Sequence, residues 1–111
     1  MAATVSTHVL DVARGTAAAG ISVGLFALGG ERTLINVGIT NHDGRTDAPL
    51  AKNLAPGIYE LVFAVTDYFE LDAIDAFFDE IPIRFRIADG TARYHIPLLL
   101  SPWGYSTYRG S

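Results

Sequence analysis

The stretch Ile81-Pro82-Ile83-Arg84-Phe85-Arg86-Ile87 decides the fold of this 111-residue chain. Apolar residues occupy every second position, and two of the three positions between them are arginines. Because successive side chains of a strand point to opposite faces of a sheet, this alternation is typical of a β-strand with one buried face and one face in water. We therefore expect a protein built from β-strands.

Two further runs, residues 33–40 and 58–65, also alternate with a period of two. Both carry apolar side chains on each of their two faces, which is typical of strands that are buried on both sides. Turn-forming sequences separate the runs, namely Gly29-Gly30, Asn41-His42-Asp43-Gly44, Pro56-Gly57 and Asp89-Gly90. Short strands joined by short loops predict an all-β antiparallel sandwich.

One segment departs from this period. Asp67 followed by Glu70 resembles a capping box, and Leu71, Ile74 and Phe77 or Phe78 then recur at helical spacing. We predict one short helix between two strands. Acidic residues surround it and predict a solvated outer face: Asp67, Glu70, Asp72, Asp75, Asp79 and Glu80.

Length and composition limit the kind of protein. A chain of 111 residues fits a single domain, residues 1–111, with one modest core. Half of the residues are hydrophobic and only 18% are charged, so we expect more apolar surface than one core can hide, and hence self-association. The net charge of −4 and the scattered basic residues argue against nucleic acid as a partner.

The location is predicted from what the sequence lacks. It contains no cysteine, which excludes thiol nucleophiles, thiolate metal sites and disulfides. Residues 1–8 have neither the basic nor the apolar region of a signal peptide, and no apolar run approaches the ~18 residues that span a membrane. We expect a soluble, cytoplasmic protein with no membrane partner.

Three histidines are available for chemistry. His42 lies in a turn, where a solvated side chain is ordinary, whereas His8 and His95 lie in strand-like runs. Pro97, two residues after His95, predicts an edge strand or a bulge, because proline cannot donate to a sheet ladder. Taken singly, His8 and His95 fit hydrogen-bonded sheet histidines better than catalytic ones.

Elimination narrows the possible chemistry. With no cysteine and Lys52 as the single lysine, hydrolysis would most simply use water activated by a histidine. Arg45 offers a planar fork of donors for a carbonyl oxygen or a developing oxyanion, or it forms a surface ion pair with Asp43 or Asp47. The sequence has no serine-hydrolase elbow and no glycine-rich phosphate loop. A metal site using His8 and His95 has no spacing motif to support it.

Four segments in order carry a resemblance that covers essentially the whole chain. They are Ser6-Thr7-His8-Val9-Leu10-Asp11, Asp43-Gly44-Arg45-Thr46-Asp47, Tyr94-His95-Ile96-Pro97-Leu98-Leu99-Leu100-Ser101-Pro102 and Tyr105-Ser106-Thr107-Tyr108-Arg109-Gly110-Ser111. Together they resemble the transthyretin-related 5-hydroxyisourate hydrolases of purine catabolism. The Tyr-Arg-Gly-Ser ending is the element that distinguishes these enzymes from the hormone-carrying transthyretins.

The resemblance implies a prealbumin/transthyretin-like antiparallel sandwich of two four-stranded sheets with one short helix. It also implies a homotetramer, a dimer of dimers, with active sites at the interface between dimers. The implied reaction is hydrolysis of 5-hydroxyisourate to 2-oxo-4-hydroxy-4-carboxy-5-ureidoimidazoline in urate degradation, with neither metal nor organic cofactor. A transthyretin-like carrier of small molecules without catalysis is the alternative.

Family motifs match five site residues. The resemblance implies that His8, Arg45 and His95 are catalytic and that Arg45, Tyr108 and Ser111 bind substrate. We expect the two histidines to converge on one water molecule and Arg45 to hold carbonyl oxygens of the substrate. Arg109 and Gly110 are expected to position the tail, the glycine by permitting close backbone approach. Residues added after Ser111 should therefore impair activity more than residues added before Met1.

Overall fold

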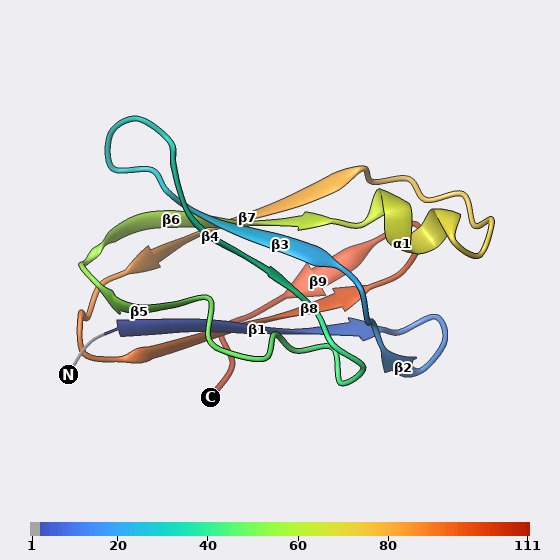
Figure 1. Ribbon diagram of the computed structural model, residues 1–111, viewed down its shortest axis with the longest axis horizontal. Helices are drawn as coiled ribbons and strands as arrows, with labels where there is room; N and C mark the ends of the chain where they lie inside the picture. Colours follow the sequence, from blue (N-terminus) through green and yellow to red (C-terminus); the bar gives the residue numbers. More distant parts are fainter. Residues whose placement is uncertain (1–2) are drawn as a thin grey trace.

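A computed structural model describes residues 3–111, in which two β-sheets pack face to face and a short helix lies at one end (Figure 1). The strands are β1 (Ala3–Asp11), β2 (Thr16–Ala17), β3 (Ser22–Ala27), β4 (Thr33–Ile39), β5 (Ala51–Leu54), β6 (Gly57–Ala64), β7 (Glu80–Ile87), β8 (Arg93–Leu100) and β9 (Tyr105–Thr107). The helix is α1 (Thr66–Glu70). The prediction of an all-β sandwich with one short helix is confirmed.

Strand order shows how the chain forms the two layers. One sheet has the order β2-β1-β8-β9, and β5 pairs with β1 on the same side as β2. The other sheet has the order β4-β3-β6-β7. Every pair is antiparallel except β1 with β8, which run parallel. This parallel pair joins the N-terminal strand to one near the C-terminus, and the candidate site lies on it.

The core lies between the sheets and follows from the alternation in the sequence. Along β1, buried and half-buried residues alternate without a break, and β7 buries Ile81 and Ile87 while its arginines are exposed. The largest core side chains come from both sheets, from α1 and from two positions just before strands: Phe63, Phe69, Ile21, Leu25, Leu50, Leu61, Ile81, Ile87, Leu98 and Leu100. Side chains on the opposite faces of the strands are left for the surface and the site.

One strand does not have the burial that its sequence predicts. β6 is buried on both faces along most of its length, as expected, but β4 is exposed along almost all of its length. Val37 and Ile39 are 50% and 64% exposed. β4 is an edge strand of its sheet, so it has a neighbour on one side only. The prediction that residues 33–40 are buried on both faces is wrong for this chain by itself.

The helix is shorter and earlier than predicted. Asp67 lies inside α1, the residue at the N-cap position is Val65, and no side chain caps the helix. Leu71 is 85% exposed and Ala73 has a φ of 54°, which ends the helical path. Phe69 is the helical residue that packs into the core. The capping box and the helical spacing beyond Glu70 were therefore wrong, although a short helix is present.

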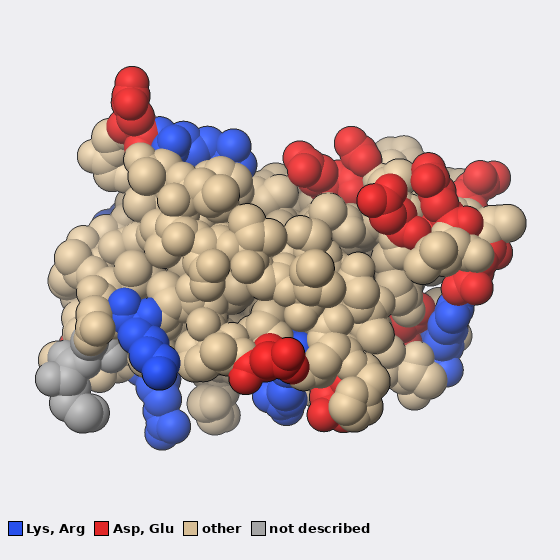
Figure 2. All heavy atoms as spheres, viewed as in Figure 1, with Lys and Arg blue, Asp and Glu red and all other residues tan. Residues whose placement is uncertain are grey.

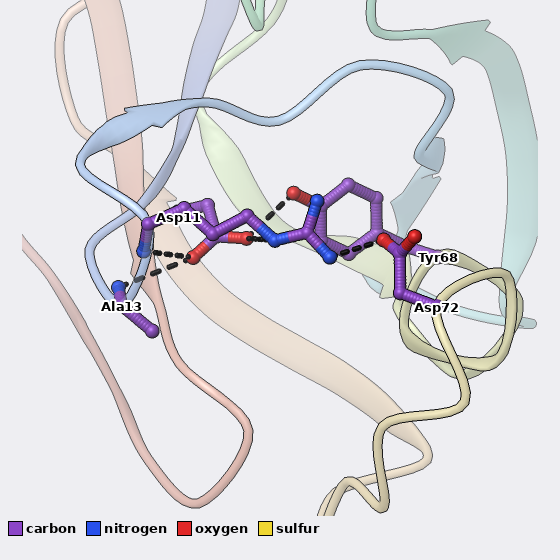
Figure 3. Close-up of polar contacts among 5 residues, drawn as sticks. Asp11, Ala13, Tyr68 and Asp72 are labelled. Atoms are coloured by element: carbon purple, nitrogen blue, oxygen red, sulfur yellow. Dashed lines mark hydrogen bonds and ion pairs between the residues drawn. The ribbon is translucent and has the colours of Figure 1, made fainter.

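Buried polar contacts attach this helix to the turn after β1 (Figure 3). One carboxylate oxygen of Asp11, a residue 1% exposed, accepts the backbone N–H groups of Ala13 and Arg14, both at 3.1 Å. The other accepts the hydroxyl of Tyr68 at 2.6 Å. Arg14 bridges the same carboxylate to Asp72, two residues beyond the end of α1. Because burial and the Asp11 carboxylate raise the pKa of Tyr68 to about 12, the phenol remains protonated and keeps donating.

Surface charge is unevenly distributed. Acidic side chains gather over α1 and the segment that follows it (Figure 2), and all six predicted acidic residues of this region are exposed. The solvated acidic face is therefore confirmed. Across residues 3–111, no helix has the length and apolar character that a membrane crossing requires.

Candidate active site

The site begins with the register between β1 and β8. Ser6 lies directly opposite His95, and His8 lies opposite Pro97. Directly opposed residues of neighbouring strands have their side chains on one face of a sheet. Core residues occupy the intervening positions of β1, so Ser6, His8 and His95 share the face that is turned away from the core. The structure thus brings the two predicted histidines together.

Arg45 lies beside His8 because the loop after β4 returns to β1. An isolated antiparallel bridge pairs His8 with Arg45, and the N–H of Val9 donates to the carbonyl of Gly44 at 2.8 Å. Gly44 has a φ of +78°, and a Cβ there would lie 2.3 Å from the carbonyl oxygen of Val9. Only glycine permits both this conformation and this close contact. The turn therefore fixes the backbone position from which the Arg45 side chain extends.

The C-terminal tail reaches His95 from the other side. The N–H of Gly110 donates to the carbonyl of His95 at 2.7 Å, and a Cβ on Gly110 would lie 2.6 Å from the imidazole Cδ2. Arg109 holds the tail in place, with its guanidinium 4.3 Å from the centre of the Tyr94 ring and a hydrogen bond to the carbonyl of Arg93 at 3.2 Å. The expected positioning roles of Arg109 and Gly110 agree with these contacts.

Pro97 has a different place from the predicted one. β8 lies between β1 and β9, so of the two predicted alternatives, an edge strand or a bulge, the edge strand is wrong. The ladder to β9 covers Leu98 to Leu100, and pairing resumes only at the bridge between His95 and Gly110. Pro97 lies within this interruption, where no N–H is required, and its carbonyl accepts the hydroxyl of Thr107 at 2.7 Å.

Four chain segments therefore lie side by side across one sheet, in the order Arg45, His8, His95, Gly110. Neighbouring strands are about 4.8 Å apart, and His95 lies diagonally to His8, a separation of about 7–8 Å, because Pro97 is the residue opposite His8. Adjacent members of this row are therefore close enough to contact one small molecule. The loop after β4 and the C-terminal tail lie at the two ends of this row, and Figure 1 shows both on the face of the sheet that is turned away from the other sheet. A cavity of about 190 Å³ lies at the Arg45 end of this row, where Ser6 and Arg45 line it and neither His8 nor His95 does.

The electrostatics of His95 suit a proton acceptor. Partial burial lowers the pKa of this imidazole below its ordinary value of 6.5, and electrostatic interactions with Arg45 and, less strongly, with His8 lower it further. The ring is therefore neutral at neutral pH. Its Nδ1 lies 2.9 Å from the hydroxyl of Ser6, a residue that sequence reasoning did not select. In the sequence, only the strand face that Ser6 shares with His8 could have indicated it as a site residue. Its contact with His95 depends on the register of two distant strands.

The remaining candidates are placed as follows. Tyr108 is 60% exposed and lines a separate cavity of about 250 Å³ between β7, β8 and β9, while Ser111 is exposed next to Gly110. His42 is exposed in its turn, as predicted, and its Nε2 lies 3.6 Å from a carboxylate oxygen of Asp43. Within residues 3–111, Arg45 forms no ion pair, so the predicted alternative of a pairing with Asp43 or Asp47 is wrong.

Metal ligation was the remaining option for the two histidines. Among the described residues, no group of three or more His, Cys, Asp or Glu side chains is placed to hold a metal ion. Imidazole, guanidinium, hydroxyl and backbone groups make up the site. Such a set can bind a small polar molecule and exchange a proton with it.

The two sheets, the parallel β1–β8 pair and the short helix define a transthyretin-like sandwich. The chain belongs to the HIUase/Transthyretin family, whose sequence profile matches residues 5–110. This membership confirms the resemblance seen in the four sequence segments.

Individual relatives refine the comparison. The chain is 50% identical to 5-hydroxyisourate hydrolase of Deinococcus radiodurans over 112 residues, which cover 96% of this chain and 94% of that protein. The solved structure of Klebsiella pneumoniae 5-hydroxyisourate hydrolase has a TM-score of 0.85 and 36% identity, covering 97% and 99% of the two chains. Sea bream transthyretin in complex with thyroxine has a TM-score of 0.89 at 24% identity, covering 96% and 94%, a likeness in fold alone. These matches place the chain with the enzymes of the family.

Proposed function

We propose that this protein hydrolyses 5-hydroxyisourate to 2-oxo-4-hydroxy-4-carboxy-5-ureidoimidazoline, a step of urate degradation. The observation that carries the proposal is the row of Arg45, His8, His95 and Gly110 across one sheet face. The name and the 50% identity of the Deinococcus radiodurans relative supply the substrate.

In the proposed reaction, water attacks the carbonyl carbon of a ring amide. One histidine of the pair takes a proton from the water as its oxygen bonds to carbon, and a proton passes to the leaving nitrogen as the C–N bond breaks. The neutral state of His95 supports it as the proton acceptor, with His8 orienting the water or donating the proton. The step uses water and side chains of the chain, without a metal or an organic cofactor.

Arg45 is assigned to the substrate oxygens. Its guanidinium has no carboxylate partner within residues 3–111, so its donors are available for a ligand. A planar fork can hold a carbonyl oxygen in the ground state and bind it more strongly as negative charge develops on it. Tyr108 and Ser111 are assigned to substrate binding on the same tail that contacts His95.

We further propose that the active protein is a homotetramer in which a second copy completes each site. The cavity of about 190 Å³ beside Arg45 is lined by neither histidine and is smaller than the roughly 300–1,000 Å³ typical of small-molecule pockets. β7 and β9 are both edge strands, with a cavity between them that has apolar walls. The exposed rings of Phe77 and Trp103 stack with centroids 6.3 Å apart. Unpaired strand edges and exposed aromatic rings both favour association with another copy.

The direct test follows the spontaneous decay of 5-hydroxyisourate, generated with uricase, by absorbance with and without the protein. We expect clear acceleration at micromolar protein, and its loss in His8→Asn and in His95→Asn. His42→Asn is the matched control, because His42 is an exposed turn residue. No acceleration by the wild-type chain would reject the enzyme function in favour of the carrier, and unchanged turnover in His95→Asn or after removal of residues 108–111 would reject the site.

Two further measurements complete the test. Nuclear magnetic resonance of the reaction mixture identifies the product, and the expected one carries a new carboxylate. Light scattering coupled to size-exclusion chromatography gives the mass of the assembly. A fully active monomer would contradict the proposed role of a second copy.

A further inference from the structure

We propose that Ser6 is a positioning residue that holds the imidazole of His95 in one orientation and one tautomer, with Nδ1–H directed at the Ser6 hydroxyl and Nε2 left as the proton acceptor. The inference rests on the proposed function, because it assigns the atom of His95 that meets the water molecule. It concerns a side chain that has no place in the mechanism described so far.

The contact is direct and its two ends are fixed by the backbone. Ser6 Oγ lies 2.9 Å from His95 Nδ1, and the two residues face each other in the parallel ladder of β1 and β8. His95 is also held on its far side, where its carbonyl accepts the N–H of Gly110. Serine has a single side-chain torsion that orients its hydroxyl oxygen, so little conformational freedom is lost in keeping the contact.

The hydroxyl of Ser6 has a different kind of partner from the hydroxyl of its neighbour on β1, Thr7. Thr7 is 2% exposed and its hydroxyl donates to the backbone carbonyl of Ile96 at 2.6 Å, which is a structural link between the strands. The hydroxyl of Ser6 has one hydrogen-bond partner within residues 3–111, the ring of His95. The strands are therefore already joined without Ser6, and its hydroxyl acts on the orientation of the imidazole.

The direction of this hydrogen bond determines what His95 can do. A neutral imidazole carries one N–H, and the hydrogen bond at one nitrogen selects the tautomer at the other. If Nδ1–H donates to Ser6 Oγ, Nε2 has a free lone pair and can take a proton from water. Arg45 lies near enough for its charge to act on the ring. A cation favours a lone pair over an N–H on a nitrogen that faces it, and Nε2 is the nitrogen that Ser6 does not occupy. His8 acts in the same sense when it is protonated.

The test uses Ser6→Ala, which removes the hydroxyl, and Ser6→Thr, which restores one. Ser22→Ala is the matched control, because Ser22 is a half-buried strand residue of the other sheet. The tautomer is observed directly by long-range proton–nitrogen-15 correlation on labelled protein, with His95→Asn used to assign the signals. Steady-state kinetics on 5-hydroxyisourate give kcat and KM separately for each variant.

We expect the wild-type spectrum to show His95 protonated at Nδ1, and Ser6→Ala to show a mixture of the two tautomers. Removal of the partner that orients a functional histidine should lower kcat by about 10- to 100-fold, as seen for such partners in metal sites. KM should stay near its wild-type value, because Arg45 remains. Ser6→Thr should recover most of kcat, and Ser22→Ala should match the wild type in both measurements.

Several results would overturn the proposal. They are a wild-type His95 protonated at Nε2, an unchanged spectrum in Ser6→Ala, and a kcat in Ser6→Ala equal to that of the wild type. If Ser6→Ala fails to fold, the wild-type tautomer and the Ser6→Thr kinetics still decide it. A wild-type chain that does not hydrolyse 5-hydroxyisourate contradicts the proposed function, whereas the spectrum still reports whether Ser6 selects the tautomer.

Discussion

Gly110 and His95 are in contact through both backbone and ring: the N–H of Gly110 donates to the His95 carbonyl at 2.7 Å, and a Cβ on Gly110 would lie 2.6 Å from Cδ2 of the imidazole. The last residues of the chain therefore limit where the ring can lie. Since the contacting atoms are ring and backbone atoms, a larger residue at position 110 must displace one of the two.

The first prediction concerns Gly110→Ala. The added methyl group should push the tail and the His95 ring apart, and a misplacement of about 1 Å in such a site costs on the order of 100-fold in rate. The measurement is kcat/KM on 5-hydroxyisourate together with the melting temperature. Gly29→Ala is the control, because a Cβ there meets no atom within 4 Å. Full activity in Gly110→Ala would show that the tail does not position His95.

Arg45→Lys tests the geometry of the guanidinium rather than its charge. Lysine keeps the positive charge but cannot provide two parallel N–H donors, so kcat/KM should fall by about 10²- to 10³-fold if the fork stabilises the developing oxyanion. Arg84→Lys is a suitable control, since Arg84 and its partner Glu60 both lie in the sheet that does not carry the site. A fully active Arg45→Lys variant would show that the reaction does not require two parallel N–H donors from Arg45.

The pH dependence follows from the direction of the His95 shift. Burial, Arg45 and His8 lower the pKa of His95 below 6.5, so the neutral base persists to more acidic pH than for a free histidine. We expect kcat/KM to rise with pH through an acidic limb centred below 6.5 and then to level off. A limb centred at or above 6.5, or a nuclear magnetic resonance titration of His95 with such a midpoint, would contradict the assignment.

The same shift has a consequence for stability. Between the unfolded pKa of His95 and its lower folded pKa, the unfolded chain binds more protons than the folded one. The contribution of His95 to the free energy of unfolding therefore decreases as the pH falls through this window. Urea unfolding of the wild type and of His95→Asn at several pH values isolates this contribution, which should be absent in the variant.

Tyr68→Phe tests the link between the helix and the turn after β1. Loss of the phenol leaves one oxygen of the buried Asp11 carboxylate without its donor, and such a loss costs about 1–3 kcal/mol. Urea unfolding should show this decrease with the m-value unchanged. In Tyr105→Phe, the control, the hydroxyl that is removed makes no hydrogen bond within the described residues, so stability should change little. Equal stability of Tyr68→Phe and the wild type would show that the contact is not stabilising.

Local pattern was sufficient for much of the fold. The alternation in residues 81–87 is present in the strand as alternating burial, since a strand's side-chain period is a property of the backbone itself. Turn signals at Asn41 to Gly44 are local in the same way. The pattern failed at β4 and after Glu70, because burial depends on which neighbours the tertiary structure supplies and not on the apolar character of the segment.

The sequence by itself determined the strand period, the turns, and, through its four motifs, the family and the choice of His8, Arg45 and His95 as candidates. Only the tertiary structure decided that Ser6 contacts His95 across 89 residues, that Arg45 has no carboxylate partner within residues 3–111, and that Gly110 contacts the ring. The physical reason is that register between distant strands is set by the packing of the whole sheet. No pattern within one segment records which residue of another segment will lie opposite to it.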